Sequence, residues 1–492
     1  MYSSQYIAKE NRPKMNIKLP FTLLLICLFG WGAYSQSPKN VLMIAIDDLN
    51  DFVSCMDGSI QIPTPNIDRL AAQGVLFTNA HCQAPICGPS RASIMTGLYP
   101  STTGNYLQLQ DRDIKKSNPA ARTAEFIPDY FEKHGYQSFG VGKIFHQGDN
   151  AQVFDTYGGK NGFYGPRVSP RFHYDPALLA HKKGNTMTDW GAYPEHDSLM
   201  PDYKSTQWAL AKLQEIKDQP FFMAVGYIRP HVPWYVPQKW FDRFPLDSIV
   251  LPPYLANDYD DIPAFAKRVT EAPQMPTTEE MQAQNQWKKI IQAYSACVAF
   301  VDHEIGKLLN GLEASEHAEN TIVALWSDHG YHLGEKNRFA KQALWERDTR
   351  TVLIVKDGTH THKTVTAPVQ LVDLYPTLLE LTGLPKKTDL DGRSLAPLIK
   401  RPNTIWPFPA LSFYGHGNLA IRDHRFRLIR YADGSRELYD MKTDPNEWRN
   451  LAQDSNYLET INVLEEALPE HWADLSPFSK YNFNAYFRAL TE

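Results

Sequence analysis

The chain has 492 residues, of which 43% are hydrophobic and 21% are charged, and its formal net charge is −5. This composition is typical of a globular protein long enough for one large and one smaller domain, and it excludes a disordered or fibrous chain. Nucleic acid is not expected as a partner, because no long basic run provides the positive face that binding it requires. A small positive pocket for an anionic substrate remains compatible with this charge.

The N-terminus has the pattern of a secretory signal. Lys14 and Lys18 precede an apolar run over residues 19–31, and small residues follow at the two positions that a signal peptidase reads. We therefore expect residues 1–35 to be removed and the mature protein to be exported, either to the periplasm or into the medium. The apolar run is short for a bilayer crossing, so stable membrane insertion is not expected.

Apolar runs alternate with helical patterns over the first 390 residues. Buried strands are predicted at residues 40–46, 221–227, 321–326 and 352–355, and helices at residues 65–73, 123–134, 204–216 and 291–312. This alternation is typical of an α/β domain whose central sheet is mostly parallel and is flanked by helices. We assign residues 36–390 to this large domain. Within it, residues 157–203 and 251–276 lack periodicity and are predicted to be long loops over one face.

The pattern changes after residue 390. Short strands separated by tight turns are predicted at residues 410–414, 419–422, 425–431 and 437–440, and helical segments at residues 457–472. This order predicts a smaller C-terminal α+β subdomain, residues 391–492, with an antiparallel sheet.

Two acidic segments directly follow predicted strands, namely Asp47-Asp48 and Asp328-His329. Ligands of such sheets lie at the carboxyl ends of the strands. Carboxylates gathered there repel one another and lose hydration unless a cation joins them, so a hard divalent ion is one interpretation. The alternative is that each pair only caps a turn.

A second feature is the segment that starts at Cys87. Pro89 suits the first turn of a helix and Gly97 suits its end, which places Cys87 at the N-terminus, where free N–H groups favour an anion. Arg91, one turn further, can donate two hydrogen bonds to an oxyanion. The alternative is an inert buried thiol or half of a disulfide, for example with Cys82.

Three further segments present basic groups. Lys143 and His146 lie three residues apart and so share one face of a helix or turn, which suits binding an anion and moving a proton. His231 follows a predicted strand in a stiff proline-rich loop, and Lys341 follows the second acidic segment. Each of these residues taken singly also fits a solvated surface.

Together these segments resemble the sulfatase family of the alkaline-phosphatase-like superfamily. C-G-P-S-R from Cys87, with Thr96-Gly97 behind it, fits the signature C-x-P-S-R, whose cysteine is converted to formylglycine (3-oxoalanine) during export. Residues 135–146 (GYQSFGVGKIFH) fit the second family signature, and residues 64–77 fit an early helix. The resemblance extends from about Lys39 into the C-terminal subdomain. It implies maturation by a formylglycine-generating enzyme.

The resemblance also implies the ligands of one calcium ion, which would be Asp47, Asp48, Asp328, His329 and the modified Cys87. Many family members have Asn where His329 stands, and imidazole is a softer ligand than calcium usually prefers. A His at this position is similar to iduronate 2-sulfatase. With Cys87 committed to modification, Cys55, Cys82 and Cys297 leave at most one disulfide.

The family chemistry gives the basic residues distinct roles. The aldehyde at position 87 would hydrate, and one hydroxyl, stabilised by the metal and Arg91, would attack sulfur. Lys143 and Lys341 would spread the charge of the sulfuryl group. His231 would protonate the departing sugar oxygen, and His146 would take the proton of the second hydroxyl, so that the aldehyde re-forms and expels sulfate.

The expected substrate is a sulfated oligosaccharide. Residues 226–233 and 328–330 most resemble iduronate 2-sulfatase, which favours a sulfated uronic acid or related sugar from a glycosaminoglycan or an algal polysaccharide such as ulvan. Arg167, Arg171 and His173 are candidates for binding a carboxylate, and solvated side chains are the alternative reading. The alternative activity is a phosphodiesterase or phosphonate monoester hydrolase of the same superfamily.

Overall fold

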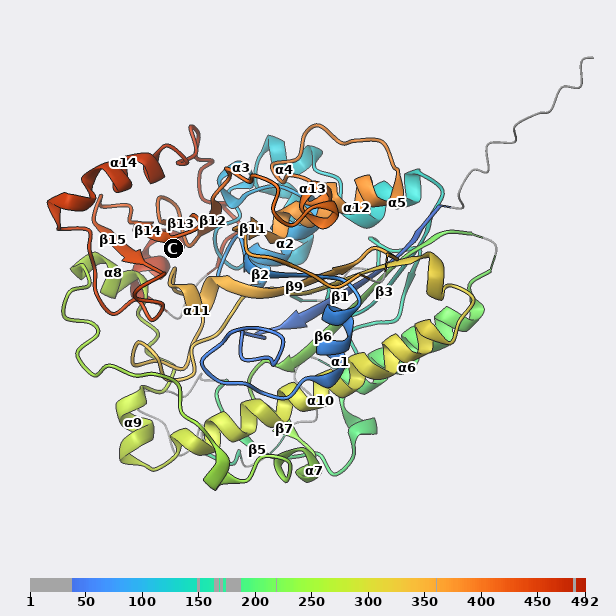
Figure 1. The fold of residues 1–492 in the computed structure, drawn as a ribbon, viewed down its shortest axis with the longest axis horizontal. Coiled ribbons are helices and arrows are strands. Elements are labelled where there is room, and N and C mark those ends of the chain that lie inside the picture. The colour runs from blue at the N-terminus through green and yellow to red at the C-terminus, as the bar shows by residue number, and fades with distance from the viewer. Residues whose placement is uncertain are drawn as a thin grey trace, which may run out of the picture. The chain divides into compact units, whose positions relative to one another are not determined.

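Figure 1 shows the computed structural model, in which a large sheet is covered by helices on both faces and a smaller sheet lies beside it. The structure describes residues 38–492 except 148–150, 163–167, 169–170, 174–186, 218, 360 and 481–483. The predicted signal segment, residues 1–35, and Arg167 lie outside the described residues.

The large sheet of the described chain has nine strands in the order β10-β2-β9-β8-β1-β6-β3-β4, with β11 beside β2. Their bounds are β1 (Asn40–Asp47), β2 (Val75–His81), β3 (Gln137–Gly142), β4 (Thr156–Tyr157), β6 (Phe221–Pro230), β8 (Thr321–Ser327), β9 (Arg350–Lys356), β10 (Lys363–Val365) and β11 (Val369–Gln370). β1 pairs in parallel with β6 and β8, and β6 pairs in parallel with β3. The prediction of a mostly parallel central sheet is confirmed.

Two features of this sheet differ from the sequence expectation. β9 is antiparallel to β8 and to β2, because the chain after β8 returns through a long loop and a single helical turn rather than through a crossover helix. β2 and β3 were not predicted, since Thr78 and Asn79 interrupt one apolar run and Gly140 and Gly142 interrupt the other.

The helices of the described chain are α1 (Pro65–Ala72), α2 (Cys87–Thr96), α3 (Pro100–Thr103), α4 (Pro119–Thr123), α5 (Ile127–Lys133), α6 (Pro201–Glu215), α7 (Gln238–Phe241), α8 (Ala264–Val269), α9 (Thr278–Ala283), α10 (Trp287–Glu313), α11 (Glu346–Thr349), α12 (Leu374–Thr382), α13 (Ala396–Lys400), α14 (Leu458–Glu465) and α15 (Ala485–Thr491). Short 3-10 helices occur at Asp111–Lys116, Asp197–Leu199, Leu246–Ser248, Ala318–Asn320, Leu371–Asp373 and Ser455–Tyr457. The helix predicted at residues 123–134 is divided, because α4 ends at Thr123 and α5 starts at Ile127, with Pro128 in its first turn.

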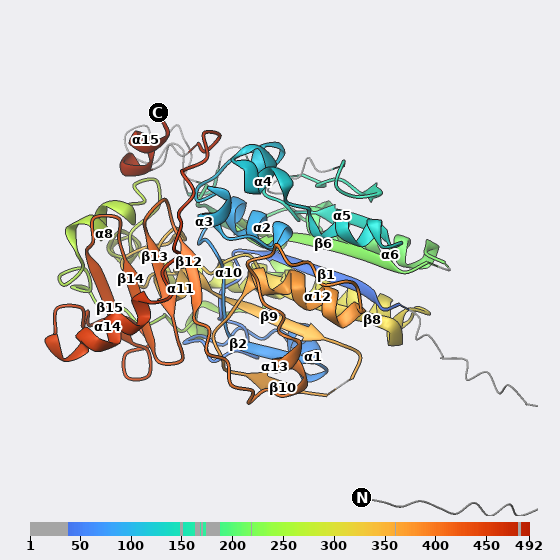
Figure 2. The same cartoon turned by 90° about the horizontal axis from the view of Figure 1, so that it is seen from above.

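The strands bury side chains on both faces of the large sheet. Leu42 and Ile44 of β1 enter the core that α1, α6 and α10 cover, whereas Val41 and Met43 enter the core that α2, α5 and α12 cover. Figure 1 shows these two helix layers below and above the sheet, and Figure 2 shows the second layer from above. The double burial explains why β1 reads as a continuous apolar run.

The C-terminal sheet is antiparallel, as predicted, with strands β12 (Ala410–Phe413), β13 (Leu419–Arg422), β14 (Phe426–Arg430) and β15 (Arg436–Asp440). It shares a third core with α8 and with residues 343–345. Arg427 also pairs with Glu346, and Trp345 Nε1 donates to Glu437 at 2.8 Å. The helix α14 ends at Glu465, earlier than predicted. The boundary between residues 390 and 391 stays a prediction.

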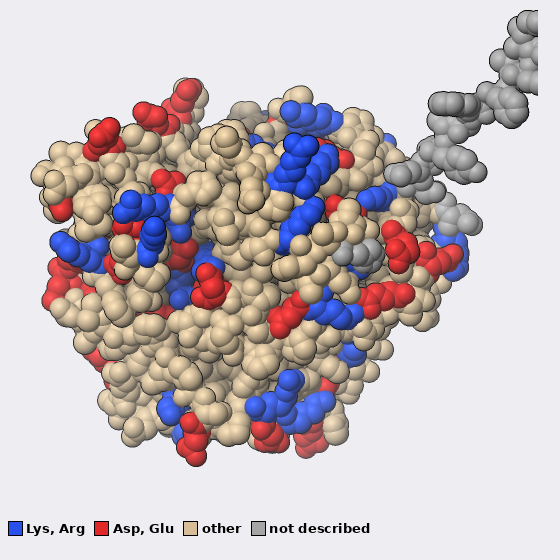
Figure 3. Space-filling model, in the orientation of Figure 1, with Lys and Arg blue, Asp and Glu red and all other residues tan. Residues whose placement is uncertain are grey.

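The region predicted as long loops contains short regular elements. β5 (Trp190–Ala192) pairs in parallel with β7 (Trp234–Val236), α6 begins at Pro201, and α8 lies within the second loop region. Over most of the face in Figure 3 basic and acidic side chains are interspersed, with a short row of basic side chains over α13. Within the described ranges, no helix has the length and apolarity needed to cross a bilayer.

The cysteines of the described chain are all free thiols, with Cys82, Cys87 and Cys297 buried and Cys55 half-buried. No disulfide is therefore formed among them, and the expectation of at most one bridge stays a prediction.

The buried carboxylate of Asp302 ties α10 to the N-terminus of α1. Its Oδ1 accepts the N–H groups of Asn66 at 3.1 Å and Ile67 at 2.9 Å, and its Oδ2 accepts Nδ2 of Asn66 at 2.8 Å. Burial raises the pKa of Asp302 to about 6, despite these hydrogen bonds.

This pKa predicts a pH-dependent stability. Between an ordinary value of 3.8 and about 6 the folded protein keeps a proton that the unfolded chain has lost, so stability falls as pH rises through this window. Relative to Asp302→Asn, the wild type should lose on the order of 2–3 kcal/mol of unfolding free energy between pH 4 and pH 7. Denaturant unfolding of both proteins at each pH measures the difference, and a constant difference would contradict the assignment.

Candidate active site

Parallel pairing of β1 with β8 brings the two acidic segments together. Ile46 and Ser327 are register partners, so Asp47, Asp48 and Asp328 leave neighbouring strands at the same edge. The N–H of Asp48 donates to Asp328 Oδ1 at 3.2 Å, and the N–H of Asp328 donates to the carbonyl of Ile46 at 3.1 Å. All three carboxylates are buried.

Cys87 is the first residue of α2, as predicted, and Gly97 ends this helix at φ 72°. All ten residues of α2 are buried. The sulfur of Cys87 lies 3.0 Å from Lys341 Nζ and 3.3 Å from His329 Nε2. The helix N-terminus therefore points its first side chain into the group of charges at the ends of β1 and β8.

Asp47, Asp48, Cys87 and His329 each offer one ligand atom, and these four atoms lie within 4.8 Å of one another. Asp47 Oδ1 and Asp48 Oδ2 are buried without a hydrogen-bond partner in the described part of the chain. Buried carboxylate oxygens are costly unless a donor or a cation satisfies them, so this set fits a divalent cation. His329 Nδ1 lies 2.9 Å from the carbonyl of Gly330, a hydrogen bond that directs Nε2 to the cluster.

Asp328 lies beside this cluster rather than within it. Its Oδ2 accepts Arg91 Nε at 2.8 Å, and its Oδ1 accepts the N–H of Asp48 and lies 3.6 Å from His329 Nε2. Burial raises the pKa of Asp328 to about 7, although Arg91 opposes this effect. Burial alone would lower the pKa of the His329 imidazole, but the neighbouring carboxylate of Asp328 outweighs it and raises this pKa to about 9.

The guanidinium of Arg91 is buried beside the carboxylate cluster and holds neighbouring groups in position. Besides Asp328 it donates through Nη1 to the carbonyls of Lys143 and Ile144, and it packs over Trp326 at 5.5 Å. Its Nη2 is 3.6 Å from Asp47 Oδ1. The sequence predicts two hydrogen bonds from Arg91 to a bound anion, and this stays a prediction. In the structure Nε and Nη1 hold a carboxylate and two backbone carbonyls, and Nη2 is buried without an acceptor among the described residues.

Two lysines lie close to the metal-ligating cluster and to position 87. Lys143 is fully buried and donates to Asp47 Oδ2, whereas Lys341 Nζ contacts both Cys87 and Asp48 Oδ1, the latter at 2.6 Å. Burial works to raise the pKa of the Cys87 thiol, but the two lysines and His329 outweigh it and hold this pKa well below its usual range. The site is therefore built to hold negative charge at position 87.

His231 reaches the same cluster from the end of β6. Its Nδ1 lies 2.5 Å from the carbonyl of Val232, and its Nε2 is 3.8 Å from Asp48 Oδ2. Arg229 holds this loop by donating to the carbonyls of Tyr235 and His231, both at 3.0 Å. His231 therefore lies at the rim of the sheet, as predicted. Arg229 positions the loop that carries it.

His146 is held by two side chains that the sequence analysis missed. Asp111 accepts the N–H groups of His146 at 3.1 Å and Gln147 at 2.6 Å, and Lys160 Nζ donates to the carbonyls of the same two residues at 3.0 and 2.6 Å. Burial lowers the pKa of His146, which favours the neutral ring that can accept a proton. No motif marks Asp111 or Lys160, because both act on backbone groups.

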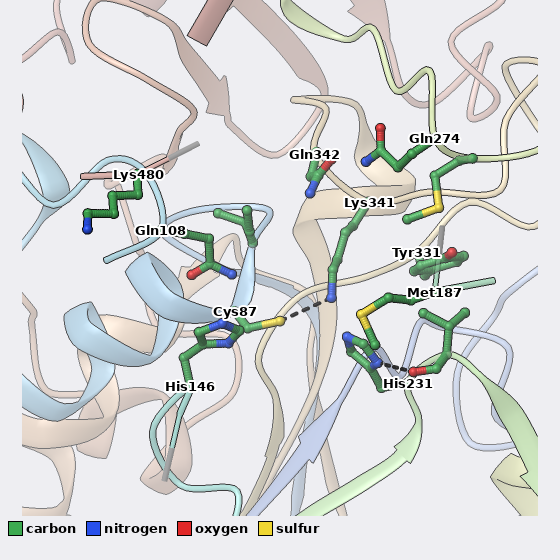
Figure 4. A pocket seen from close by; sticks show the side chains of 13 residues that line it. Cys87, Gln108, His146, Met187, His231, Gln274, Tyr331, Lys341, Gln342 and Lys480 are labelled. Carbon is green, nitrogen blue, oxygen red and sulfur yellow. Dashed lines mark hydrogen bonds between the residues drawn. The ribbon is translucent and has the colours of Figure 1, made fainter. Parts of the chain in front are cut away.

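A cavity of about 300 Å³ opens at Cys87 (Figure 4). His146, His231 and Lys341 line it together with residues absent from the sequence prediction, namely Ile86, Gln108, Met187, Val232, Gln274, Met275, Tyr331, Gln342 and Lys480. Arg171 and His173 do not line it within the described residues. Arg171 donates to the carbonyl of Thr188 at 2.8 Å, and His173 stacks on Trp190 at 4.0 Å.

The mostly parallel sheet, the buried helix N-terminus and the carboxylate cluster at the carboxyl ends of the strands define a hydrolase of the alkaline-phosphatase-like class. The family model described as Sulfatase matches residues 39–384, and the one described as N-sulphoglucosamine sulphohydrolase, C-terminal, matches residues 334–474. The chain belongs to the sulfatase family and is a sulfatase, as its sequence motifs predicted.

Individual proteins agree with this assignment. A sulfatase of Formosa agariphila is 46% identical over 480 residues, which cover 95% of both chains. Iduronate 2-sulfatase of Mus musculus is 31% identical over 424 residues, 75% of this chain and 74% of the relative. The solved structure of BT4656 in complex with its substrate D-glucosamine-2-N,6-O-disulfate has a TM-score of 0.66 at 24% identity, and the match covers 87% of this chain and 96% of that one.

The hydrogen bonds of Asp111 to the backbone at His146 predict that a residue outside the cavity affects the turnover rate. Asp111→Ala removes the acceptor of two backbone N–H groups and should displace the imidazole, which lowers kcat for an aryl sulfate by roughly 10- to 100-fold with little change in KM. Asp111→Asn keeps one acceptor and should restore part of the rate. Steady-state kinetics measure both.

Asp113 provides the matched control. It lies in the same 3-10 helix, but its carboxylate accepts a hydrogen bond from the exposed Lys116 at 2.9 Å and none from the backbone of His146 or Gln147. Asp113→Ala should therefore leave kcat within about twofold of the wild type. Equal losses in the two alanine variants would contradict the positioning role of Asp111.

Proposed function

We propose that this sulfatase removes sulfate from a sulfated carbohydrate, with Cys87 converted to formylglycine and a calcium ion held beside it. The observation that carries the proposal is the electrostatic setting of position 87. This residue is the first of a buried helix, two lysines depress the pKa of its thiol, and it opens to a cavity. Such a setting favours a nucleophile that attacks an anionic group.

The calcium proposal rests on the donor set of Asp47, Asp48, His329 and the side chain at position 87, with Asp328 beside them. Oxygen ligands predominate, which suits a hard divalent cation, and the two carboxylate oxygens without donors are the natural contacts. The ion would neutralise charge on the sulfate group. The single imidazole is the ligand that departs from a typical calcium site.

The residues of the chain then have separate tasks. When hydrated, the aldehyde at position 87 provides the attacking oxygen and a second hydroxyl. Lys341 would bind the sulfuryl oxygens, and its contact with position 87 at the cavity supports this role. His231 faces the cavity from the end of β6 and would protonate the leaving oxygen, and His146 would hold the proton of the hydroxyl.

For the substrate we propose a sulfated uronic acid or related sugar from a glycosaminoglycan or an algal polysaccharide such as ulvan. The similarity to a protein named iduronate 2-sulfatase supports a sulfated uronic acid, and the similarity to one named ulvan-active sulfatase supports the algal source. The C-terminal match is to a family named for N-sulphoglucosamine, an amino sugar, which is among the related sugars. We further propose that the protein is exported through its N-terminal signal and matured by a formylglycine-generating enzyme.

The decisive experiment combines mass spectrometry with turnover. Protein from the native host, or produced with a formylglycine-generating enzyme, should carry the aldehyde on the peptide that contains Cys87 and should release sulfate from an aryl sulfate and from defined sulfated saccharides. An unmodified thiol in native protein would contradict the proposal. Faster hydrolysis of aryl phosphonates or phosphodiesters than of aryl sulfates would favour the alternative activity of the same superfamily.

The cation gives a separate prediction. Dialysis against a chelator should abolish sulfate release, and added Ca²⁺ should restore it more fully than Mg²⁺, because Ca²⁺ accepts variable coordination whereas Mg²⁺ demands a near-ideal octahedron of ligands. Ca²⁺ should also raise the Tm of the chelated wild type by mass action.

Asp48→Ala, which removes one of the proposed ligands, is the comparison. Its Tm should no longer respond to Ca²⁺. Full activity in chelator, or an equal rise of Tm in this variant, would refute the metal assignment.

A further inference from the structure

Two glutamines that line the cavity each have a side-chain carbonyl without a donor among the residues that the structure describes. Gln274 and Gln342 both line the space beyond Cys87, and Figure 4 shows their amides on the side of Lys341. Each is 7% exposed, and the Oε1 atom of each is buried without a hydrogen-bond donor among the described residues. Gln108, on the opposite side of the cavity, differs because its Oε1 accepts the N–H of Gly88 at 3.0 Å.

The backbone fixes both side chains in this position. Gln342 directly follows Lys341, its N–H donates to the carbonyl of Pro85 at 3.0 Å, and its φ is 81°. A residue other than glycine in this left-handed region is strained, and such strain persists where surrounding structure enforces it, often at functional sites. Gln274 lies between two prolines, in a turn closed by the N–H of Met275 donating to Ala272 at 2.9 Å.

A buried amide carbonyl that lacks a donor is costly. A half-turn of either amide about its terminal bond exchanges the oxygen and the nitrogen and presents the carbonyl to the cavity, where a ligand hydroxyl can donate to it. A sulfate or carboxylate group carries no proton at neutral pH and does not supply one. A sugar hydroxyl donates one hydrogen bond and accepts others, which matches an amide with one acceptor and two donors. Tyr331, which also lines the cavity, has its hydroxyl committed to the carbonyl of Phe339 at 2.8 Å.

We propose that Gln274 and Gln342 form the subsite that recognises hydroxyl groups of the sugar whose sulfate ester is held at position 87. This inference rests on the proposed sulfatase function and adds the chemistry that distinguishes a saccharide from a simple sulfate ester. The two amides contribute binding specificity, whereas the cation site and the basic residues act on the sulfate group itself.

The test uses the formylglycine-containing enzyme and its Gln274→Met and Gln342→Met variants, since Met keeps the length of the side chain but neither donates nor accepts as an amide does. Hydrolysis of 4-methylumbelliferyl sulfate is measured with three competitors. These are a 2-O-sulfated disaccharide from heparin digestion, sulfated oligosaccharides from ulvan digestion, and inorganic sulfate. Gln282→Met, on the exposed face of α9, is the matched control.

In each variant we expect the inhibition constant of the most tightly bound saccharide to rise by about 3- to 10-fold relative to the wild type. The inhibition constant of inorganic sulfate and the kcat/KM for the aryl sulfate should change much less. The Tm of each variant should not fall below that of the wild type, because the replaced carbonyl has no donor within the described ranges of the chain. The control variant should leave all of these quantities unchanged.

Several results would overturn the inference. A hydroxyl-binding role would be excluded if the variants lost affinity equally for saccharide and for inorganic sulfate, or if saccharide inhibition were unchanged. It would also be excluded if a lowered Tm accounted for the lost affinity, or if no saccharide inhibited the wild type. Failure of the proposed function would look different. In that case the wild-type enzyme would carry the aldehyde at position 87 and still not hydrolyse the aryl sulfate.

Discussion

The structure depends on the balance of buried charges at the ends of β1 and β8. Asp47, Asp48 and Asp328 are withdrawn from water, and Lys143, Lys341 and Arg91 are buried against them. Such pairs lose much of their hydration energy, and each member becomes costly when its partner is removed. The two packed layers of helices maintain the strand register that holds these groups a few ångströms apart.

The walls of the site come from segments far apart in the chain. α2 supplies Cys87, the loop after β3 supplies His146, the end of β6 supplies His231, and the loop before α11 supplies Lys341. Arg91 of α2 links two of these segments by donating to the carbonyl of Lys143, and Asp202 of α6 holds the end of β6 by accepting the N–H of Arg229. The chemistry therefore depends on tertiary contacts as much as on the motifs themselves.

The sequence predicted those parts of the site that lie at the ends of regular elements. Asp47 and Asp328 were located because parallel strands end at one edge of a sheet, and Cys87 because proline and glycine mark the ends of its helix. Gln274, Gln342 and Lys160 were missed because they lie in segments without periodicity. The bracing position of Arg91 and the antiparallel direction of β9 depend on tertiary packing, which a local pattern does not contain.

The burial of α2 sets an order of events for maturation. Cys87 is 1% exposed, and every residue of its helix is enclosed by the sheet, α12 and the loops around it. A second enzyme has no access to the thiol once these elements have closed over it. If the cysteine is converted as proposed, the conversion belongs to the interval between synthesis and folding, and a chain that folds too early would be left permanently without its nucleophile.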